Sequence, residues 1–149
     1  MPIHQNVRVP LSAAQILNLG TTPVQIVAPS AGQIIVPYNT YLRLFAGTTP
    51  FNPLSGDDLA FYLGNPANTQ LIEYPGGLSA IGFADQTVDM SQWHDGWMGG
   101  GATADSTVDI IGSGLFLALG NGGTFPSGTN WTSGNGTMLA LVEYSLVTP

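Results

Sequence analysis

The residues best suited to catalysis surround His94. Ser91 lies three positions before it and Asp95 directly after it, and these are the three residue types of a hydrolytic triad. A triad needs the three groups to converge from separate elements, and neighbours within one segment do not supply that geometry. The other histidine, His4, lies near the amino terminus and is interpreted as an exposed bystander. The chain has no cysteine and no lysine, so thiol and amine nucleophiles are excluded.

Acidic residues offer a second kind of chemistry, either sugar hydrolysis by a carboxylate pair or calcium binding by clustered oxygens. The candidates are Asp57, Asp58, Asp85, Asp89, Asp95, Asp105 and Asp109. None of the close pairs among them follows the EF-hand spacing of carboxylates around a glycine, and solvated loop acids explain them equally well. We therefore predict that the protein is not an enzyme and that it has no catalytic residue, no metal site and no cofactor.

Charge is sparse and one-sided. Two arginines stand against nine acidic residues, which gives a formal net charge of −7. Only 7% of the residues are charged, compared with about 25% in an ordinary soluble domain. Dispersed ions keep monomers apart, so this composition favours a component of an assembly over the alternative of an isolated β domain. Two cations neutralise few phosphates, and we expect no nucleic-acid partner.

Neither a membrane span nor an export signal is expected. The longest apolar runs, Leu115–Leu119 and Met138–Val142, are far shorter than the roughly 20 residues of a spanning helix. The first residues, MPIHQNVRVPLSAAQ, lack the apolar core of a signal peptide. We expect a protein with no membrane partner that reaches its place without an amino-terminal address.

Short strands separated by turn residues dominate the sequence. The central stretch Thr21–Phe45 holds three apolar runs, at 24–27, 34–36 and 41–45, with turns predicted at PSAG (29–32) and PYN (37–39). Further strands are predicted at 58–63, 69–73, 79–83, 107–111, 115–119 and 137–147. The best helical segment begins after Ser12, with Gln15 completing a capping box and Gly20 as a possible stop. This pattern predicts an all-β protein, an antiparallel β-sandwich or jelly roll of about eight to ten short strands with long loops.

Side chains alternate along a strand, which assigns faces. Leu42 and Leu44 share one face, and Tyr41, Arg43 and Phe45 share the opposite one. The closing strand has one wholly apolar face, made of Met138, Ala140, Val142, Tyr144 and Leu146. Its opposite face is apolar at one end only, as expected where a strand leaves a core or enters a subunit contact; its residues are Leu139, Leu141, Glu143, Ser145 and Val147.

The chain is interpreted as an amino-terminal arm, residues 1–10, followed by a single β-sandwich domain, residues 11–149. Within the arm, Val7-Arg8-Val9 is either a short edge strand or part of an extended tail. A long irregular loop is predicted at 84–106, because no periodicity is sustained there, and long loops in compact domains are usually functional or disordered.

Aromatic residues in the irregular segments are the best candidates for recognition. Trp93, Trp97 and Met98 lie in the loop 84–106, and Trp131 lies in a turn-rich segment at 120–136. Tryptophan is enriched among interface hot spots. The rings can instead fold back as lids on the ends of the sandwich, or stack on sugars. The predicted interface residues are Val7, Arg8, Val9, Trp93, Trp97, Met98 and Trp131.

Two parts of the sequence resemble a known family. The amino-terminal segment LSAAQILNLGTTPVQIVAPSAGQIIVP, which leads into YLRLF, and the closing strand GTMLALVEYSLV are together similar to small structural proteins of tailed bacteriophages, in particular capsid decoration or cement proteins. The likeness covers roughly the first third of the chain and the last fifteen residues. Residues 84–136 have no counterpart in it.

This resemblance implies a jelly-roll protomer, usually a homotrimer, on the outer surface of an icosahedral head. Its partner would be the major capsid protein, and it would stabilise the shell by binding only the assembled form. The arm with Arg8 is expected to contact the shell. The alternative is a receptor-binding or carbohydrate-binding domain of a head fibre or tail tip, built on the same sandwich.

Overall fold

The computed structural model describes residues 4–28, 31–64, 70–73, 86–89, 111–121 and 126–149. These residues form eight strands and one short helix. In chain order the elements are β1 (His4–Leu11), α1 (Ala13–Leu17), β2 (Val24–Val27), β3 (Ile34–Phe45), β4 (Asp57–Leu63), β5 (Gln70–Glu73), β6 (Gln86–Asp89), β7 (Leu115–Asn121) and β8 (Thr137–Val147).

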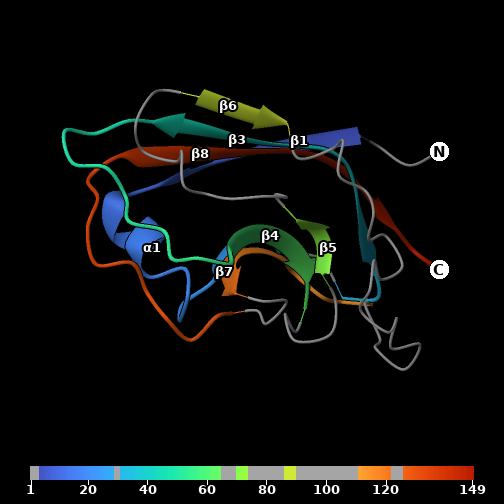
Figure 1. Cartoon of the computed structure of the whole chain (residues 1–149). Helices are drawn as coiled ribbons and strands as arrows, with labels where there is room; N and C mark the ends of the chain where they lie inside the picture. Colours follow the sequence, from blue (N-terminus) through green and yellow to red (C-terminus); the bar gives the residue numbers. More distant parts are fainter. Residues whose placement is uncertain (1–3, 29–30, 65–69, 74–85, 90–110, 122–125) are drawn as a thin grey trace.

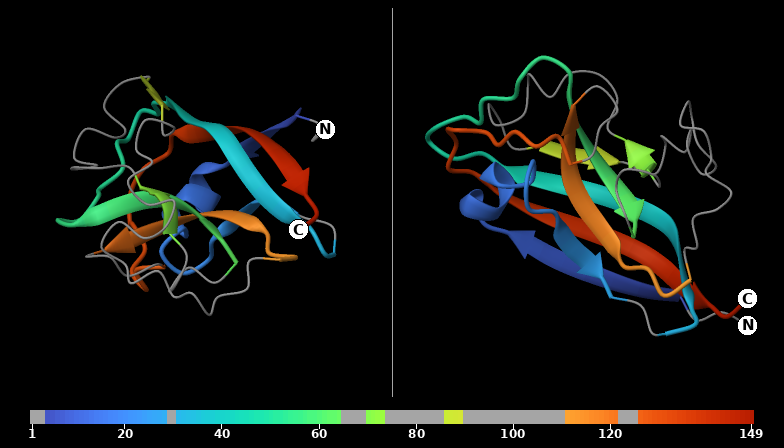
Figure 2. Two further views of the ribbon diagram at one scale, coloured as in Figure 1. Left: turned by 90° about the vertical axis from the view of Figure 1, so that its right-hand side faces the viewer. Right: turned by 90° about the horizontal axis from the view of Figure 1, so that it is seen from below.

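The strands form two four-stranded antiparallel sheets, which lie as two facing layers (Figure 1, Figure 2). The strand orders are β1-β8-β3-β6 and β2-β7-β4-β5. The pairs β1 with β8, β2 with β7, β3 with β6 and β4 with β5 are nested in the sequence, so the chain resembles one long hairpin rolled into a sandwich. The pairs β3 with β8 and β4 with β7 then join successive windings. This arrangement is the eight-stranded jelly roll, and the predicted fold class is confirmed.

The core lies between the sheets and follows the predicted alternation. On β8 the face from Met138 to Tyr144 is buried at every second residue, and on β3 Leu42 and Leu44 are buried while Phe45 is 42% exposed. Strands β4 and β7 of the other sheet contribute a second set of buried apolar residues: Leu59, Phe61, Leu63, Leu115, Leu117 and Leu119.

The turn predicted at 37–39 is wrong. Residues 34–45 form one continuous strand, and the register against β8 shifts between Pro37 and Asn39. A bulge leaves one residue outside the ladder, and a proline lacks the N–H that a regular ladder position would use. Pro37 therefore marks irregular pairing within one strand and not a chain reversal.

The interpretation of residues 1–10 as a separate arm is also wrong for the residues described. Strand β1 pairs with β8 along its whole length, from His4 opposite Ser145 to Leu11 opposite Met138, and Leu11 is 1% exposed. The edge-strand alternative is the correct one. Pro10 sits within the strand, which an edge strand tolerates because one side of its backbone needs no partner.

Helix α1 has the predicted capping box. The Gln15 backbone N–H donates to Ser12 Oγ at 3.3 Å, and the Ser12 backbone N–H donates to Gln15 Oε1 at 3.0 Å. The helix ends before Asn18, earlier than the stop predicted at Gly20. Its buried residue, Ile16, anchors it to the sandwich core.

The predicted irregular loop at 84–106 contains part of the sheet. Residues 86–89 form β6, which pairs with β3 from Leu44 opposite Gln86 to Tyr41 opposite Asp89. Four residues are too few to show a reliable period. The strands predicted at 58–63, 69–73, 115–119 and 137–147 are confirmed within two residues. The strand predicted at 79–83 and residues 107–110 lie outside the described part of the chain.

Candidate interaction face on the sheet β1-β8-β3

Among the described residues, no group of three or more histidine, cysteine or acidic side chains is placed to hold a metal ion. His4 is exposed on β1, and its ring stacks on Tyr38 with centroids 4.7 Å apart. The candidate triad of Ser91, His94 and Asp95 lies outside the described residues. In the described part of the chain, no helix has the length and apolar character needed to cross a membrane.

Asp57 is the buried acid of the described core, and its contacts give it a structural role. Its side chain is 3% exposed and accepts three hydrogen bonds. The donors are the Leu54 backbone N–H at 2.6 Å, Asn121 Nδ2 at 2.9 Å and Trp131 Nε1 at 2.7 Å. A buried polar group is stable when its hydrogen bonds are made, and these three join the turn before β4, the end of β7 and the segment before β8.

The prediction that Trp131 is an interface residue is wrong. Its ring is 4% exposed and lies against Phe51 with centroids 5.6 Å apart. The ring of Trp131 folds back on the sandwich, which was the alternative prediction, and its indole N–H donates to the buried Asp57 carboxylate. Trp93, Trp97 and Met98 lie outside the described residues.

The segment around Trp131 is fixed to the end of the sandwich by side-chain hydrogen bonds. Asn52 Oδ1 accepts from the backbone N–H of Thr132 and of Ser133, each at 3.0 Å. Asn130 Nδ2 donates to Thr21 Oγ1 at 2.9 Å, and Asn135 Oδ1 accepts from the Thr49 backbone N–H at 2.8 Å. These residues therefore position the fold and are not free for recognition.

The sheet β2-β7-β4-β5 is buried on its outer face at three residues of β4 and β7. Its outward-facing residues Ala60, Tyr62 and Ala118 are at most 2% exposed, and the Tyr62 ring stacks on Phe116 with centroids 5.6 Å apart. Burial raises the pKa of Tyr62 from 10.0 to about 12, because the charged phenolate is poorly solvated there. This face offers no open surface at these residues.

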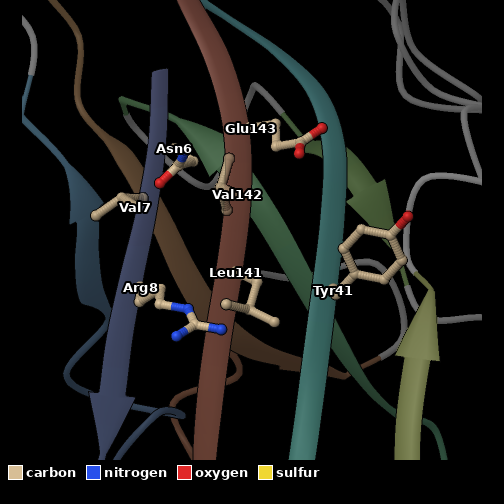
Figure 3. A pocket seen from close by; sticks show the side chains of 7 residues that line it. All are labelled: Asn6, Val7, Arg8, Tyr41, Leu141, Val142 and Glu143. Carbon is tan, nitrogen blue, oxygen red and sulfur yellow. The ribbon is translucent and has the colours of Figure 1, made fainter. Parts of the chain in front are cut away.

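The outer face of the other sheet is open along β1, β8 and β3. Cross-strand register sets its side chains in rows: Arg8, Leu141 and Tyr41 form one row, and Asn6, Glu143 and Asn39 form the next. Figure 3 shows Asn6, Arg8, Tyr41, Leu141 and Glu143 on three adjacent strands, where a hollow of about 500 Å³ lies. The hollow is lined by Asn6, Val7, Arg8, Tyr41, Leu141, Val142 and Glu143.

Both arginines of the chain lie on this face. Arg8 on β1 is exposed, and Arg43 on β3 places its guanidinium carbon 5.4 Å from the centroid of the Phe45 ring. The face formed by β1, β8 and β3 thus carries two cations and one acid, Glu143, in a chain with a net charge of −7. An apolar strip continues from it, because Pro10, Leu139 and Phe45 line a second hollow of about 420 Å³.

Strand alternation separates the three interface residues predicted in β1, which are Val7, Arg8 and Val9. Val7 and Val9 pack against the core while Arg8 points to solvent. Sequence reasoning named Arg8 but did not name Leu139, Leu141, Tyr41 or Glu143 as interface residues. The available signal was the half-apolar outer face predicted for residues 137–147.

Comparison with known proteins shows one structural likeness and no match in sequence. No protein-family model matches the chain, and no curated protein matches it in sequence. One solved structure, the capsid asymmetric unit of cyanophage Pam1, is similar over 98% of this chain and 85% of that chain, with 11% sequence identity and a TM-score of 0.45. A likeness of this degree carries no argument about the function of the present chain.

Proposed function

We propose that the protein is a structural component of a phage virion, a decoration protein that binds the outside of the head and stabilises it. The open face on β1, β8 and β3 is the observation that supports an assembly role. Half-exposed apolar side chains and both cations gather there, whereas the outward-facing residues Ala60, Tyr62 and Ala118 of the other sheet are buried.

Three further features agree with this role. The fold is a jelly roll, an architecture common in viral capsid domains but not limited to them. The chain has few ions to keep it apart from other proteins. The sequence segments at 11–45 and 136–147 resemble phage decoration proteins. In this proposal the partner is the major capsid protein and the protomers self-associate.

The proposal is tested on phage heads assembled without this protein. Adding the purified chain is expected to saturate at a fixed copy number per head and to raise the temperature at which the heads release DNA, because a ligand that binds only the assembled shell stabilises it. Absence of the chain from purified virions, together with failure to sediment with heads, would contradict the proposal.

A carbohydrate-binding domain is the second candidate. The hollow in Figure 3 combines the Tyr41 ring with the polar side chains of Asn6 and Glu143, and jelly rolls also occur in lectins. A glycan array that compares the wild type with Tyr41→Ala, Trp93→Ala and Trp97→Ala tests it. Ring-dependent sugar binding supports this candidate, and a blank array opposes it. Trp131→Ala is unsuitable, because that ring belongs to the core.

A further inference from the structure

The open face is complementary to itself. Arg8 lies in register with Leu141, and Glu143 lies two residues further along β8, in register with Asn6. Cation and anion are therefore diagonal neighbours beside an apolar side chain. Within the described residues the Arg8 side chain has no hydrogen bond or ion pair, and the Glu143 side chain accepts a hydrogen bond from Asn39 Nδ2. The face thus presents the cation of Arg8 and the anion of Glu143 without joining the two.

We propose that this face packs against the same face of a second copy of the chain. In a two-fold contact residue i of one copy meets residue j of the other, and j meets i. A two-fold axis that lies in the face and passes midway between Arg8 and Glu143 sets Arg8 of each copy opposite Glu143 of the other. One patch then supplies both members of two ion pairs.

Sheet geometry places apolar groups at the centre of this contact. Strands are about 4.8 Å apart, and alternate residues along a strand are about 6.8 Å apart. On that grid the axis passes close to Leu141 and to Tyr41, its neighbour in register on β3. Each of these side chains therefore meets its own counterpart. On the same grid the strands of the two copies cross at about 70°, which is closer to the orthogonal than to the aligned way in which sheets pack face to face.

The adjoining surface suits burial. Pro10, Leu139 and Phe45 extend the apolar area beyond Leu141, and Phe45 is 42% exposed in the single chain. Apolar contact supplies most of the affinity in such an interface, whereas the charge pairs fix its register. This inference rests on the proposed function, because that function assigns this face to assembly. It also predicts a two-fold contact, in contrast to the three-fold arrangement that the resemblance implies.

Charge exchange in the full chain tests the reciprocal pairing. Sedimentation velocity measures the dimer dissociation constant of the wild type, Arg8→Glu, Glu143→Arg and the double variant. Each single change sets like charges against each other at two symmetric positions, so we expect dissociation constants at least about tenfold higher. The double change exchanges the partners, and we expect it to restore the wild-type constant to within about threefold.

Two further variants complete the design. Gln25→Glu alters the charge of an exposed residue on β2, in the other sheet, and is expected to leave the dissociation constant unchanged. Arg8→Gln removes the cation without adding an acid and is expected to give an intermediate constant. Thermal unfolding of each variant reports whether it is folded. If Arg8→Glu or Glu143→Arg does not fold, Arg8→Gln and the double variant decide the question.

The inference is overturned if the wild type stays monomeric or forms a trimer. It is also overturned if neither single change alters the dimer dissociation constant, or if the double variant dissociates as readily as the single ones. The head-binding assay is independent of these outcomes. A chain absent from virions that dimerises with the expected charge dependence contradicts the proposed function alone. A chain that binds heads as a monomer contradicts the dimer alone.

Discussion

The indole N–H of Trp131 donates a hydrogen bond to Asp57 Oδ2 across 2.7 Å, between residues 74 positions apart in the chain. The same carboxylate accepts from Leu54 and Asn121. Through this one buried group the segment before β8 is joined to the start of β4 and the end of β7. A residue type that often marks a binding surface serves here to close one end of the sandwich.

Removing the Trp131 donor is expected to destabilise the fold. Trp131→Phe leaves Asp57 Oδ2 with one donor fewer and loosens the packing against Phe51, so we expect the free energy of unfolding to fall by about 1 to 3 kcal/mol. Urea denaturation measures this. Tyr38→Phe, at a ring that is 37% exposed, serves as control and should change stability by less than about 0.5 kcal/mol. Equal effects of the two changes would contradict the assignment.

Gly134 is expected to tolerate no side chain. Its φ of +131° is unfavourable for other residues, and an added Cβ would collide with the Phe51 ring. Gly128 has a φ of +77° but open space around the Cβ position. We expect Gly134→Ala to lower the free energy of unfolding by about 1 to 3 kcal/mol more than Gly128→Ala, because only the first adds a collision to the backbone cost. Chemical denaturation of both variants measures the difference, and equal losses would disprove the collision.

Thr40 is expected to be a site where a mutation stabilises the protein. Its hydroxyl oxygen is fully buried on the inner face of β3 and has no hydrogen-bond partner in the part of the chain that is described. Thr40→Val keeps the shape and removes the unpaired hydroxyl, so we expect a gain of about 1 kcal/mol. The midpoint of thermal unfolding measures it, with the exposed Thr22→Val as control. A lower midpoint for Thr40→Val would show that the hydroxyl is satisfied in solution.

Tyr62 is expected to make the fold sensitive to alkaline pH. Its pKa is raised from 10.0 to about 12 by burial, so its contribution to stability is complete below pH 10.0 and is lost as the pH rises toward 12. Between these values stability should fall by about 1.4 kcal/mol per pH unit more in the wild type than in Tyr62→Phe. Urea unfolding as a function of pH tests this. Identical slopes for the two proteins would contradict the burial of the phenol.

Deletion of residues 1–9 is expected to impair folding. It removes most of β1, including the packing of Val7 and Val9 against the core, and leaves the edge of β8 unpaired. Circular dichroism during heating should show a lowered or lost cooperative transition. Deletion of residues 1–3 alone, which ends before β1, should preserve the transition. A stable protein that lacks residues 1–9 would show that β1 is dispensable for folding.

Local features of this protein could be predicted from the order of its residues alone. The alternation of apolar residues in 137–147 fixed which face of β8 is buried, and Ser12 with Gln15 fixed the start of α1, because both depend only on neighbours along the chain. The sparse charge favours an assembly component without reference to any fold, and this stays a prediction.

The faces that lie together could not be predicted in this way, because they depend on how distant strands pair. Arg8 and Arg43 share one surface because β8, from the far end of the sequence, pairs with both β1 and β3. Trp131 is buried because Asp57 lies within hydrogen-bond distance of its indole nitrogen. Strand pairing and contacts over such separations are set by the packing of the whole chain, and no local pattern records them.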